Sequence, residues 1–321
     1  MRVVNGVDFL YVIPRWNRDD ADEMKGNALT TNAMTSRDAM RSGISLLERA
    51  GIEDSRLNAE RLMEYVLGVS RADLYADPDR VLTTDVKKRY AVLLHRRSGH
   101  EPLQYLLGET EFMSLPFRVG PGVLIPRPET EILVEAVVQE YSAESGVRIL
   151  DIGTGSGCIA VSLARYLPRA EVVGIDVSEV AVRIAFENAK RNGVGDRVRF
   201  QVMDITSEPS PLHFDLMSDV VVSNPPYVAL DEWTALPEEV REHEPRSALC
   251  DEGDGLSFYR IIASTAKRFL NSGGHLFFEV GDKQGGSVRR LLSEEAYRDV
   301  SIHPDLNGIG RVVVGRWRGG A

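Results

Sequence analysis

Short apolar segments alternate with helical patterns after residue 146, and this alternation restricts the chain to few folds. The expected strands span residues 147–151, 171–176, 197–202, 219–223 and 274–280. Helical patterns follow from Ser156, Ser178 and Leu256. Such alternation predicts an α/β fold with a largely parallel sheet covered by helices. Two further strands, 297–303 and 310–317, flank a turn at Asn307-Gly308 and predict an antiparallel edge.

Residues 35–99 instead contain residues that typically begin and end helices. Thr35 and Asp38 form a capping box, and Gly51 ends the first helix after an apolar stripe. A second helix is expected over 55–67, and a third opens at the Ser70-Asp73 capping box. Thr84 is expected to cap a fourth, whose apolar face runs to residue 99. A small helical bundle is therefore predicted over 35–99, and we expect it to recognise the substrate.

Three other segments complete the predicted organisation. Residues 1–34 lack periodicity and are expected to be a disordered leader, so a chain beginning at Met34 should fold and act as well as the full chain. Residues 100–127 are predicted to form a hairpin linker with a turn containing Pro116. The catalytic domain is predicted over 128–321.

Composition excludes several classes of function. The net charge of −10 disfavours direct binding to nucleic acid, because phosphate contacts depend on clustered positive charge. The chain has two cysteines and no apolar run long enough to span a membrane, which favours a reduced, cytoplasmic setting without membrane contact. The six histidines are scattered without metal-ligand spacing, so no metal site is expected.

A glycine-rich turn follows the first predicted strand. Its residues are Gly153, Thr154, Gly155, Ser156 and Gly157, and such glycines let a ligand approach bare backbone. A nicotinamide-binding fingerprint would need glycine where this chain has Cys158, which disfavours an oxidoreductase. The G-x-G-x-G pattern resembles the cofactor turn of Rossmann-like class I methyltransferases, which bind S-adenosylmethionine.

Acidic residues end the next two strands. Asp176 is placed to accept hydrogen bonds from a ribose diol; the alternative, a helix N-cap, is already supplied by Ser178. Asp204 is a candidate partner for the adenine amine, with Ile205 packed on the ring. The alternative for this pair is a turn aspartate followed by a core isoleucine.

The segment Asn224-Pro225-Pro226-Tyr227 ends the fourth strand of the sheet. Two successive prolines make a rigid loop without two backbone donors, so nearby carbonyls are free to accept hydrogen bonds. The Asn224 side-chain oxygen and the Pro225 carbonyl can accept both hydrogens of a substrate amide, while Tyr227 packs on its plane. These residues are therefore the predicted catalytic and substrate-binding group, and Asn224 also borders the predicted cofactor site.

Methyltransferases with this loop act on nitrogens of planar systems, either adenine in nucleic acid or glutamine in protein. Three further segments, 101–108, 124–131 and 243–249, resemble the protein-(glutamine-N5) methyltransferases that modify peptide chain release factors. The resemblance covers about residues 35–317. It implies transfer from S-adenosylmethionine to the glutamine of a Gly-Gly-Gln loop. A ribosomal protein is the alternative substrate, and an adenine methyltransferase or a nonenzymatic cofactor-binding module are the rival functions.

Arg127 and Glu129 fit two interpretations. Either they position cofactor or substrate, or they belong to a linker turn in which Pro128 begins a helix and Glu129 favours the helix dipole.

Overall fold

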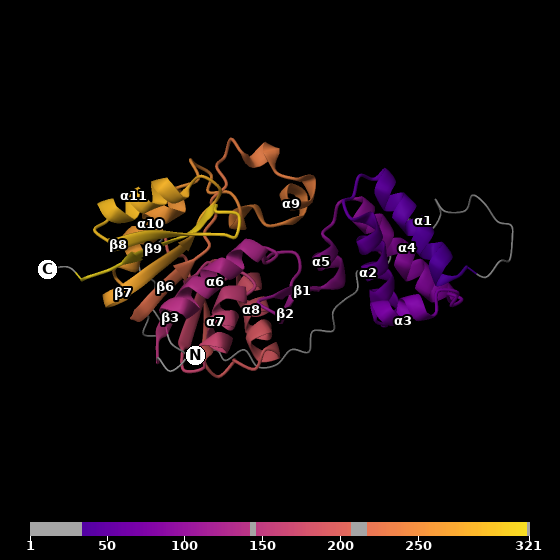
Figure 1. Cartoon of the computed structure of the whole chain (residues 1–321), viewed down its shortest axis with the longest axis horizontal. Coiled ribbons are helices and arrows are strands. Elements are labelled where there is room, and N and C mark those ends of the chain that lie inside the picture. The colour runs from indigo at the N-terminus through magenta and orange to yellow at the C-terminus, as the bar shows by residue number, and fades with distance from the viewer. Residues whose placement is uncertain (1–33, 142–145, 207–216, 320–321) are drawn as a thin grey trace.

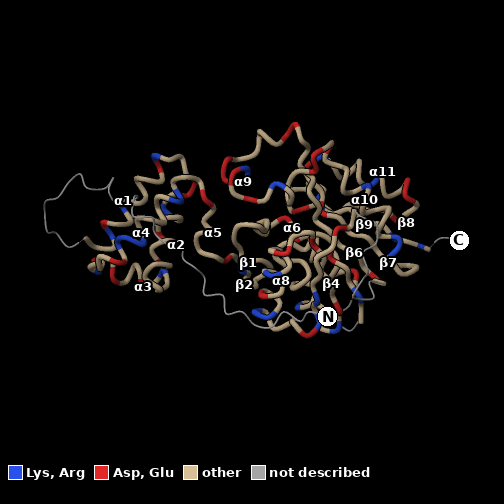
Figure 2. The backbone as a smooth tube through the Cα atoms, turned by 180° about the vertical axis from the view of Figure 1, so that it is seen from behind, with Lys and Arg blue, Asp and Glu red and all other residues tan. Residues whose placement is uncertain are grey.

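A computed structural model of the chain describes residues 34–141, 146–206 and 217–319 (Figure 1). The predicted leader lies outside these residues, apart from Met34. A helical region occupies one end of the long axis, and a larger sheet region forms the rest of the molecule. Lys and Arg are interspersed with Asp and Glu along both regions (Figure 2).

The helical region has its own core. Buried Leu47, Leu62 and Tyr90 belong to one hydrophobic cluster shared by its helices. Its helices are α1 (Ser36–Arg49), α2 (Ser55–Leu67), α3 (Arg71–Ala76), α4 (Thr84–Ser98) and α5 (Leu103–Leu107). The capping boxes predicted before α1 and α3 are both present. The predicted stop of α2 is also confirmed, because Gly68 adopts the left-handed conformation at the C-cap.

The predicted cap of α4 is wrong by one residue. Thr83, not Thr84, is the N-cap, and its hydroxyl accepts a hydrogen bond from the Val86 backbone N–H at 3.3 Å. Two adjacent threonines are equally suitable caps by residue type. The backbone decides between them, because Thr83 is extended whereas Thr84 is already helical.

The hairpin is formed by β1 (Glu109–Phe112) and β2 (Leu115–Arg118), but its turn is not where it was predicted. Pro116 lies within β2, opposite Glu111. The turn falls on Met113 and Ser114, which both have positive φ, at 51° and 54°. Two-residue hairpin turns of this kind usually carry Asn or Gly, so the sequence lacked the expected signal.

Residues 100–127 contain helix α5 as well as the hairpin. Leu106 of α5 is buried in the core of the helical region. Tyr105 faces a separate cluster with Val123 and Ile125 of the linker, and its hydroxyl donates to the Val123 carbonyl at 2.5 Å. The segment therefore packs against both regions.

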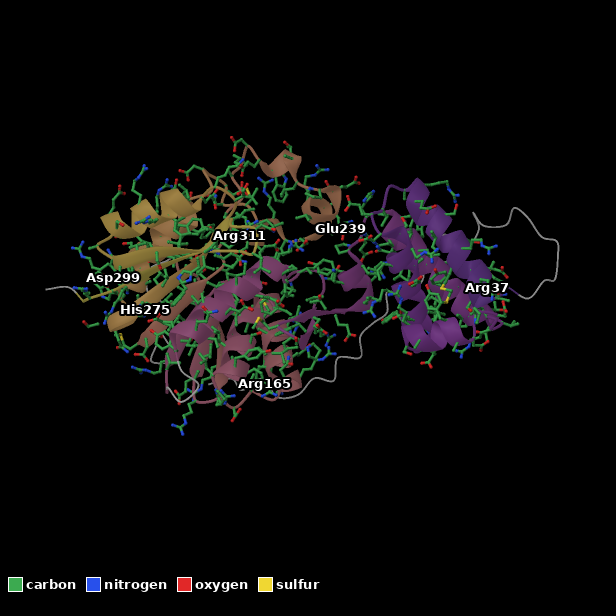
Figure 3. The ribbon with its side chains drawn as sticks, viewed as in Figure 1. Arg37, Arg165, Glu239, His275, Asp299 and Arg311 are labelled. Carbon is green, nitrogen blue, oxygen red and sulfur yellow. The ribbon has the colours of Figure 1, made fainter. Side chains whose placement is uncertain are left out.

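Helix α9 (Glu238–His243) extends from the sheet region toward the helical region, where Glu239 is labelled in Figure 3. Glu239 accepts a hydrogen bond from the Arg97 guanidinium at 2.7 Å. The same guanidinium donates to Asn58 at 2.8 Å and to the Glu101 carbonyl at 2.9 Å. The Arg97 side chain is only 6% exposed, whereas the Glu239 side chain is 31% exposed, so this contact between the regions is partly buried.

The sheet has seven strands in the order β5-β4-β3-β6-β7-β9-β8 among the described residues. Strands β3 to β7 are parallel, and β9 is antiparallel to both β7 and β8. The predicted parallel sheet with an antiparallel edge is confirmed. The strands are β3 (Arg148–Ile152), β4 (Glu171–Asp176), β5 (Val198–Val202), β6 (Ser218–Ser223), β7 (Leu270–Glu279), β8 (Arg298–Pro304) and β9 (Gly310–Arg316).

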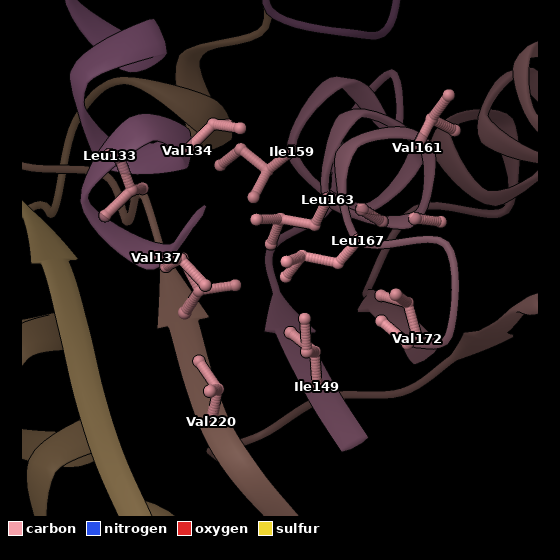
Figure 4. Close-up of a cluster of buried hydrophobic side chains, with 14 of the residues drawn as sticks. Leu133, Val134, Val137, Ile149, Ile159, Val161, Leu163, Leu167, Val172 and Val220 are labelled. Atoms are coloured by element: carbon pink, nitrogen blue, oxygen red, sulfur yellow. The ribbon is translucent and has the colours of Figure 1, made fainter. Parts of the chain in front are cut away.

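Helices cover both faces of the sheet. On one face, side chains of α6 (Pro128–Glu140) and α7 (Cys158–Tyr166) interdigitate over β3, β4 and β6 (Figure 4). Helix α8 (Glu179–Arg191) lies beside them, while α10 (Ser257–Ala266) and α11 (Gly285–Glu294) cover the other face. Helix α7 begins two residues after the predicted Ser156, because the glycine turn continues to Gly157. Helices α9 and α11 were not predicted.

Candidate active site

The carboxyl ends of the parallel strands border one cavity of about 460 Å³. Loops after adjacent parallel strands meet at this edge, which is where open α/β sheets bind ligands. The cavity is lined by the loops after β3, β4, β5 and β6, together with parts of the linker and the segment before α10. Among the predicted site residues, it brings together Gly153, Gly155, Asp176, Asp204, Ile205, Asn224, Pro225 and Pro226.

The glycines of the turn have different roles. Gly153 and Gly155 line the cavity with φ of 76° and 55°, and a Cβ on either would meet nothing within 4 Å. Their bare backbone leaves room for a ligand to approach closely, which fits the predicted cofactor. Gly157 is the N-cap of α7, and a Cβ there would lie 2.9 Å from the Ala185 Cβ. Its role is the close packing of α7 against α8.

Thr154 and Ser156 do not line the cavity. Both side chains are buried, and the Thr154 hydroxyl donates to the Asp151 carboxyl at 2.6 Å. Within the described residues the Ser156 hydroxyl has no hydrogen-bond partner. The structure therefore places these two predicted cofactor residues beneath the turn.

Asp176 lies at the end of β4 and holds the glycine turn in place. One carboxyl oxygen accepts the Gly155 N–H at 2.9 Å, and the other accepts the Ser178 N–H at 2.9 Å. Burial raises its pKa above the usual range, against the opposing effect of these backbone hydrogen bonds. Each oxygen can accept a second hydrogen bond, so a ribose diol remains a chemically suitable partner. Ser178 caps α8 by accepting the Ala181 N–H at 3.2 Å, so Asp176 is not that cap.

Asp204 and Ile205 border the cavity after β5. Asp204 accepts hydrogen bonds from the Thr206 N–H at 2.8 Å and the Thr206 hydroxyl at 2.6 Å. Ile205 is 9% exposed and packs in the core cluster beneath α10. The turn and core contacts of the alternative interpretation are therefore present at residues that also line the cavity.

The Asn224 loop is anchored on both sides. Before it, the Ser223 hydroxyl donates to the Ile152 carbonyl at 2.7 Å and ties β6 to β3. After it, the Gln284 amide donates to the Tyr227 carbonyl at 2.9 Å. The Asn224 amide donates to the Thr130 hydroxyl at 3.3 Å. Neighbouring elements thus hold the loop rigidly, as orientation of a substrate requires.

Tyr227 is not among the residues that line the cavity. It packs against the core cluster under α10, and burial raises its pKa to about 12. This placement does not bring its ring to the cavity beside Asn224. The predicted stacking of Tyr227 on a substrate amide therefore stays a prediction.

Arg127 does not line the cavity but forms an ion pair with the buried Glu244. Glu244 also accepts the Ile125 N–H at 3.0 Å, so it joins the linker to the segment that follows α9. Pro128 is the first residue of α6, as predicted. Nearby residues from both joined segments border the cavity, namely Leu124, Pro245, Ser247 and Ala248. The sequence interpretation assigned them no site role, although they belong to two of the motifs that carried the family resemblance.

Two carboxyl groups lie buried near the site. Burial raises the pKa of Asp151 to about 7 and that of Glu279 to about 7. One oxygen of each has no hydrogen-bond partner among the residues that the structure describes. In those same residues no group of three or more His, Cys, Asp or Glu side chains is arranged to hold a metal ion. No described helix is long and apolar enough to cross a membrane.

Comparisons with known proteins agree with this architecture. A family model described as the PrmC N-terminal domain matches residues 38–108, and a methyltransferase domain model matches residues 143–298. The release factor glutamine methyltransferase of Geobacter sulfurreducens is 43% identical over 84% of this chain and 92% of that protein. The proteins of that name from Fusobacterium nucleatum and Koribacter versatilis are 36% and 39% identical, over 92% and 88% of this chain and 82% and 99% of their own lengths.

The chain belongs to the release factor glutamine methyltransferase family.

For this family member, the resemblance and the class I methyltransferase fold predicted from the sequence are confirmed. The match at residues 38–108 ends beyond α5, in agreement with the packing of that helix on the helical core. The roles of individual residues in binding and transfer remain predictions.

Proposed function

We propose that this chain transfers a methyl group from S-adenosylmethionine to the side-chain nitrogen of the glutamine in the Gly-Gly-Gln loop of peptide chain release factors. The observation that carries the proposal is that Asn224 and Pro225 border the same cavity as Gly153, Gly155 and Asp176. A loop suited to holding an amide thus faces a backbone suited to holding the methyl donor.

The cofactor contacts are assigned by position on the cavity wall. The bare backbone of Gly153 and Gly155 would lie against the donor, and Asp176 would accept hydrogen bonds from its ribose. Asp204 and Ile205 would hold the adenine. When bound, S-adenosylmethionine supplies an electrophilic methyl group.

The substrate contacts come from the rigid loop. The Asn224 side-chain oxygen and the Pro225 carbonyl would accept the two amide hydrogens, which directs the nitrogen lone pair into the cavity. The fixed carbonyl dipoles would stabilise the positive charge that develops on nitrogen. Pro226 would border the bound amide, and proton loss to water would follow transfer.

Other parts of the chain fit a protein substrate. The net charge of −10, with Lys and Arg interspersed with Asp and Glu along both regions, disfavours a polyanion as the direct partner (Figure 2). We assign recognition of the release factor to the helical region. Both cysteines are free and buried, which suits a reduced cytoplasmic setting.

The test is a competition among three acceptors. Purified protein is incubated with labelled S-adenosylmethionine and, separately, with a release factor, ribosomes or DNA, with Asn224→Ala as the control. Label should enter the release factor and depend on Asn224. Label in ribosomal protein or DNA, with none in the release factor, would instead support one of the alternative substrates.

A further inference from the structure

Gln284 joins three segments of the chain at the end of the Asn224 loop. It lies in the turn between β7 and α11, and it is not among the residues that line the cavity. Its NH₂ group donates to the Tyr227 carbonyl at 2.9 Å and to the Gly255 carbonyl at 3.2 Å. Its side-chain oxygen accepts the Gly281 N–H at 3.1 Å. One side chain therefore joins the loop to the segment before α10 and to the turn after β7.

These partners leave one orientation for the Gln284 amide. Two carbonyl oxygens face its nitrogen and can only accept, whereas the Gly281 N–H can only donate. The Tyr259 hydroxyl donates to the Glu279 carbonyl at 3.0 Å and also lies 3.4 Å from the Gln284 oxygen. A reversed amide would place oxygen against two carbonyls and nitrogen against an N–H. Both hydrogens of the Gln284 NH₂ group are therefore used within the protein.

Two glycines allow this close arrangement. A Cβ on Gly255 would lie 2.8 Å from both the Gln284 amide nitrogen and the Tyr227 carbonyl oxygen. A Cβ on Gly281 would lie 2.9 Å from the Gln284 side-chain oxygen and 3.0 Å from Cδ2 of the Tyr227 ring. A side chain at either glycine would therefore displace Gln284 or Tyr227. The packing around Gln284 leaves the end of the loop little space in which to move.

The prolines of the loop transmit this constraint to Asn224. Only Pro225 and Pro226 separate Asn224 from Tyr227, and each proline ring fixes φ at about −65°. Few torsions are therefore free between Asn224 and the carbonyl that Gln284 holds. A shift of the Tyr227 carbonyl would move the Pro225 carbonyl and the Asn224 side chain, which are the groups assigned to the substrate amide.

We propose that Gln284 is a positioning residue that holds the Asn224 loop in the geometry required for methyl transfer. The inference rests on the proposed roles of Asn224 and Pro225 in binding the substrate amide. Gln284 does not border the cavity, so it acts through the Tyr227 carbonyl and not by contact with substrate or cofactor. Without its NH₂ group, the end of the loop would shift. A displacement of about 1 Å can cost roughly a hundredfold in rate, so a smaller shift is enough to lower kcat.

Gln284→Met tests the role in catalysis. Methionine keeps the length of the side chain but cannot donate to the two carbonyls. We expect kcat for release factor methylation to fall roughly tenfold. KM for the release factor should stay within about twofold, because we assign recognition of that protein to the helical region. Affinity for S-adenosylmethionine, measured by calorimetry, should also stay within about twofold, because other sides of the cavity are assigned to the cofactor.

Tyr297→Phe is the control for a general loss of stability. It removes the buried hydrogen bond that the Tyr297 hydroxyl donates to the Ala263 carbonyl at 2.9 Å, in the same core cluster that Tyr227 packs against. This variant should be less stable but keep kcat at temperatures where it is folded. An unchanged kcat in Gln284→Met, or an equal loss of kcat in Tyr297→Phe, would overturn the proposal.

A spectroscopic measurement tests the position of the loop without any substrate. The side-chain amide signals of Asn224 are assigned in ¹⁵N-asparagine-labelled protein as the pair lost in Asn224→Ala. These signals should shift in Gln284→Met and keep their positions in Tyr297→Phe. Unchanged Asn224 signals in Gln284→Met would overturn the proposal even if release factors prove not to be substrates.

Gly281→Ala provides a second variant if Gln284→Met does not fold. Gly281 is not one of the described glycines with positive φ, so alanine there adds close contacts with Gln284 and Tyr227 but no backbone strain. Gly286→Ala is the matched control, because a Cβ at Gly286 would meet nothing within 4 Å. Gly281→Ala should lower kcat and shift the Asn224 signals, and Gly286→Ala should do neither. If the two variants behaved alike, Gln284 would not position the loop.

Discussion

Buried carboxyl groups of the helical region lie against arginines, whereas two in the core of the sheet region do not. Glu60 lies 2.8 Å from Arg71, and Glu64 lies 3.0 Å from Arg61. Among the described residues, Asp151 and Glu279 form no ion pair, and burial raises the pKa of each to about 7. Asp151 lies in β3, which leads into the glycine turn that borders the cavity, and Glu279 ends β7, which pairs with β6.

This difference distinguishes the helical region, which supports the fold, from the sheet region, which contains the candidate site. The helical region pairs these buried carboxylates with arginines, whereas buried carboxyl groups without a charged partner near a cavity are a common feature of functional sites. The sheet region thus keeps polar groups whose burial is costly, and its extensive apolar core offsets that cost.

The largest expected effect lies at the cavity. Asn224→Ala should lower methyl transfer roughly a hundredfold or more, because one acceptor that orients the amide is lost. Cofactor affinity should stay within a few fold. Single-turnover rates and calorimetry on the same protein preparation measure the two quantities. Intact turnover would remove Asn224 from the catalytic group. It would also contradict the assignment of the functional site to the sheet region.

Much of the fold was predictable because local signals and tertiary packing agree. The limits of β4 and of α2, and both capping boxes, follow from patterns of a few residues. The turn at Met113 and Ser114 was missed because neither residue type favours positive φ, and α5 is too short to show a period. Local patterns carry no information on such tertiary effects.

The candidate site was predictable where a motif ends a strand. Asp176 and Asn224 were found in this way, and the structure places both on the cavity. The positions of Thr154 and Ser156 beneath the turn depend on which way each side chain points, which the motif does not specify. The contact between Thr130 and Asn224 escaped notice because the two residues are distant in sequence.

Asp151 offers a direct test of the buried carboxyl groups that have no ion-pair partner. Its folded pKa is raised above the unfolded value, so its contribution to stability is present at low pH and is lost as pH rises toward 7. Asn at this position cannot ionise. When the pH rises from about 5 to about 6.5, the wild type should therefore lose about 2 kcal/mol of its free energy of unfolding relative to Asp151→Asn. Urea denaturation at both pH values measures this, and a constant difference would contradict the account.

A substitution of Asp176 tests the side of the cavity that is assigned to the cofactor. Asp176→Ala should weaken binding of S-adenosylmethionine roughly tenfold, since charge-assisted hydrogen bonds are lost both to the ribose and to the glycine turn. Asp176→Asn serves as the control, because it keeps oxygen and shape but not charge. Calorimetry that finds equal affinity in all three proteins would exclude Asp176 from the site.

The smallest effect is expected in the helical region, with the opposite sign from that at Asp151. Glu60→Gln should lower the free energy of unfolding by about 1 kcal/mol, because Arg71 loses its partner but remains accessible to water. Methylation should be unchanged at temperatures where the protein is folded. If Glu60→Gln stabilised the protein, the contrast between paired and unpaired carboxyl groups would fail.

The most direct test of the central claim is to locate the transferred methyl group. A release factor treated with this protein and S-adenosylmethionine is digested, and tandem mass spectrometry identifies the modified atom. The account predicts one methyl group on the side-chain nitrogen of the glutamine in the Gly-Gly-Gln peptide, and almost none after treatment with Asn224→Ala. A methyl group on another residue, or equal modification by Asn224→Ala, would contradict it.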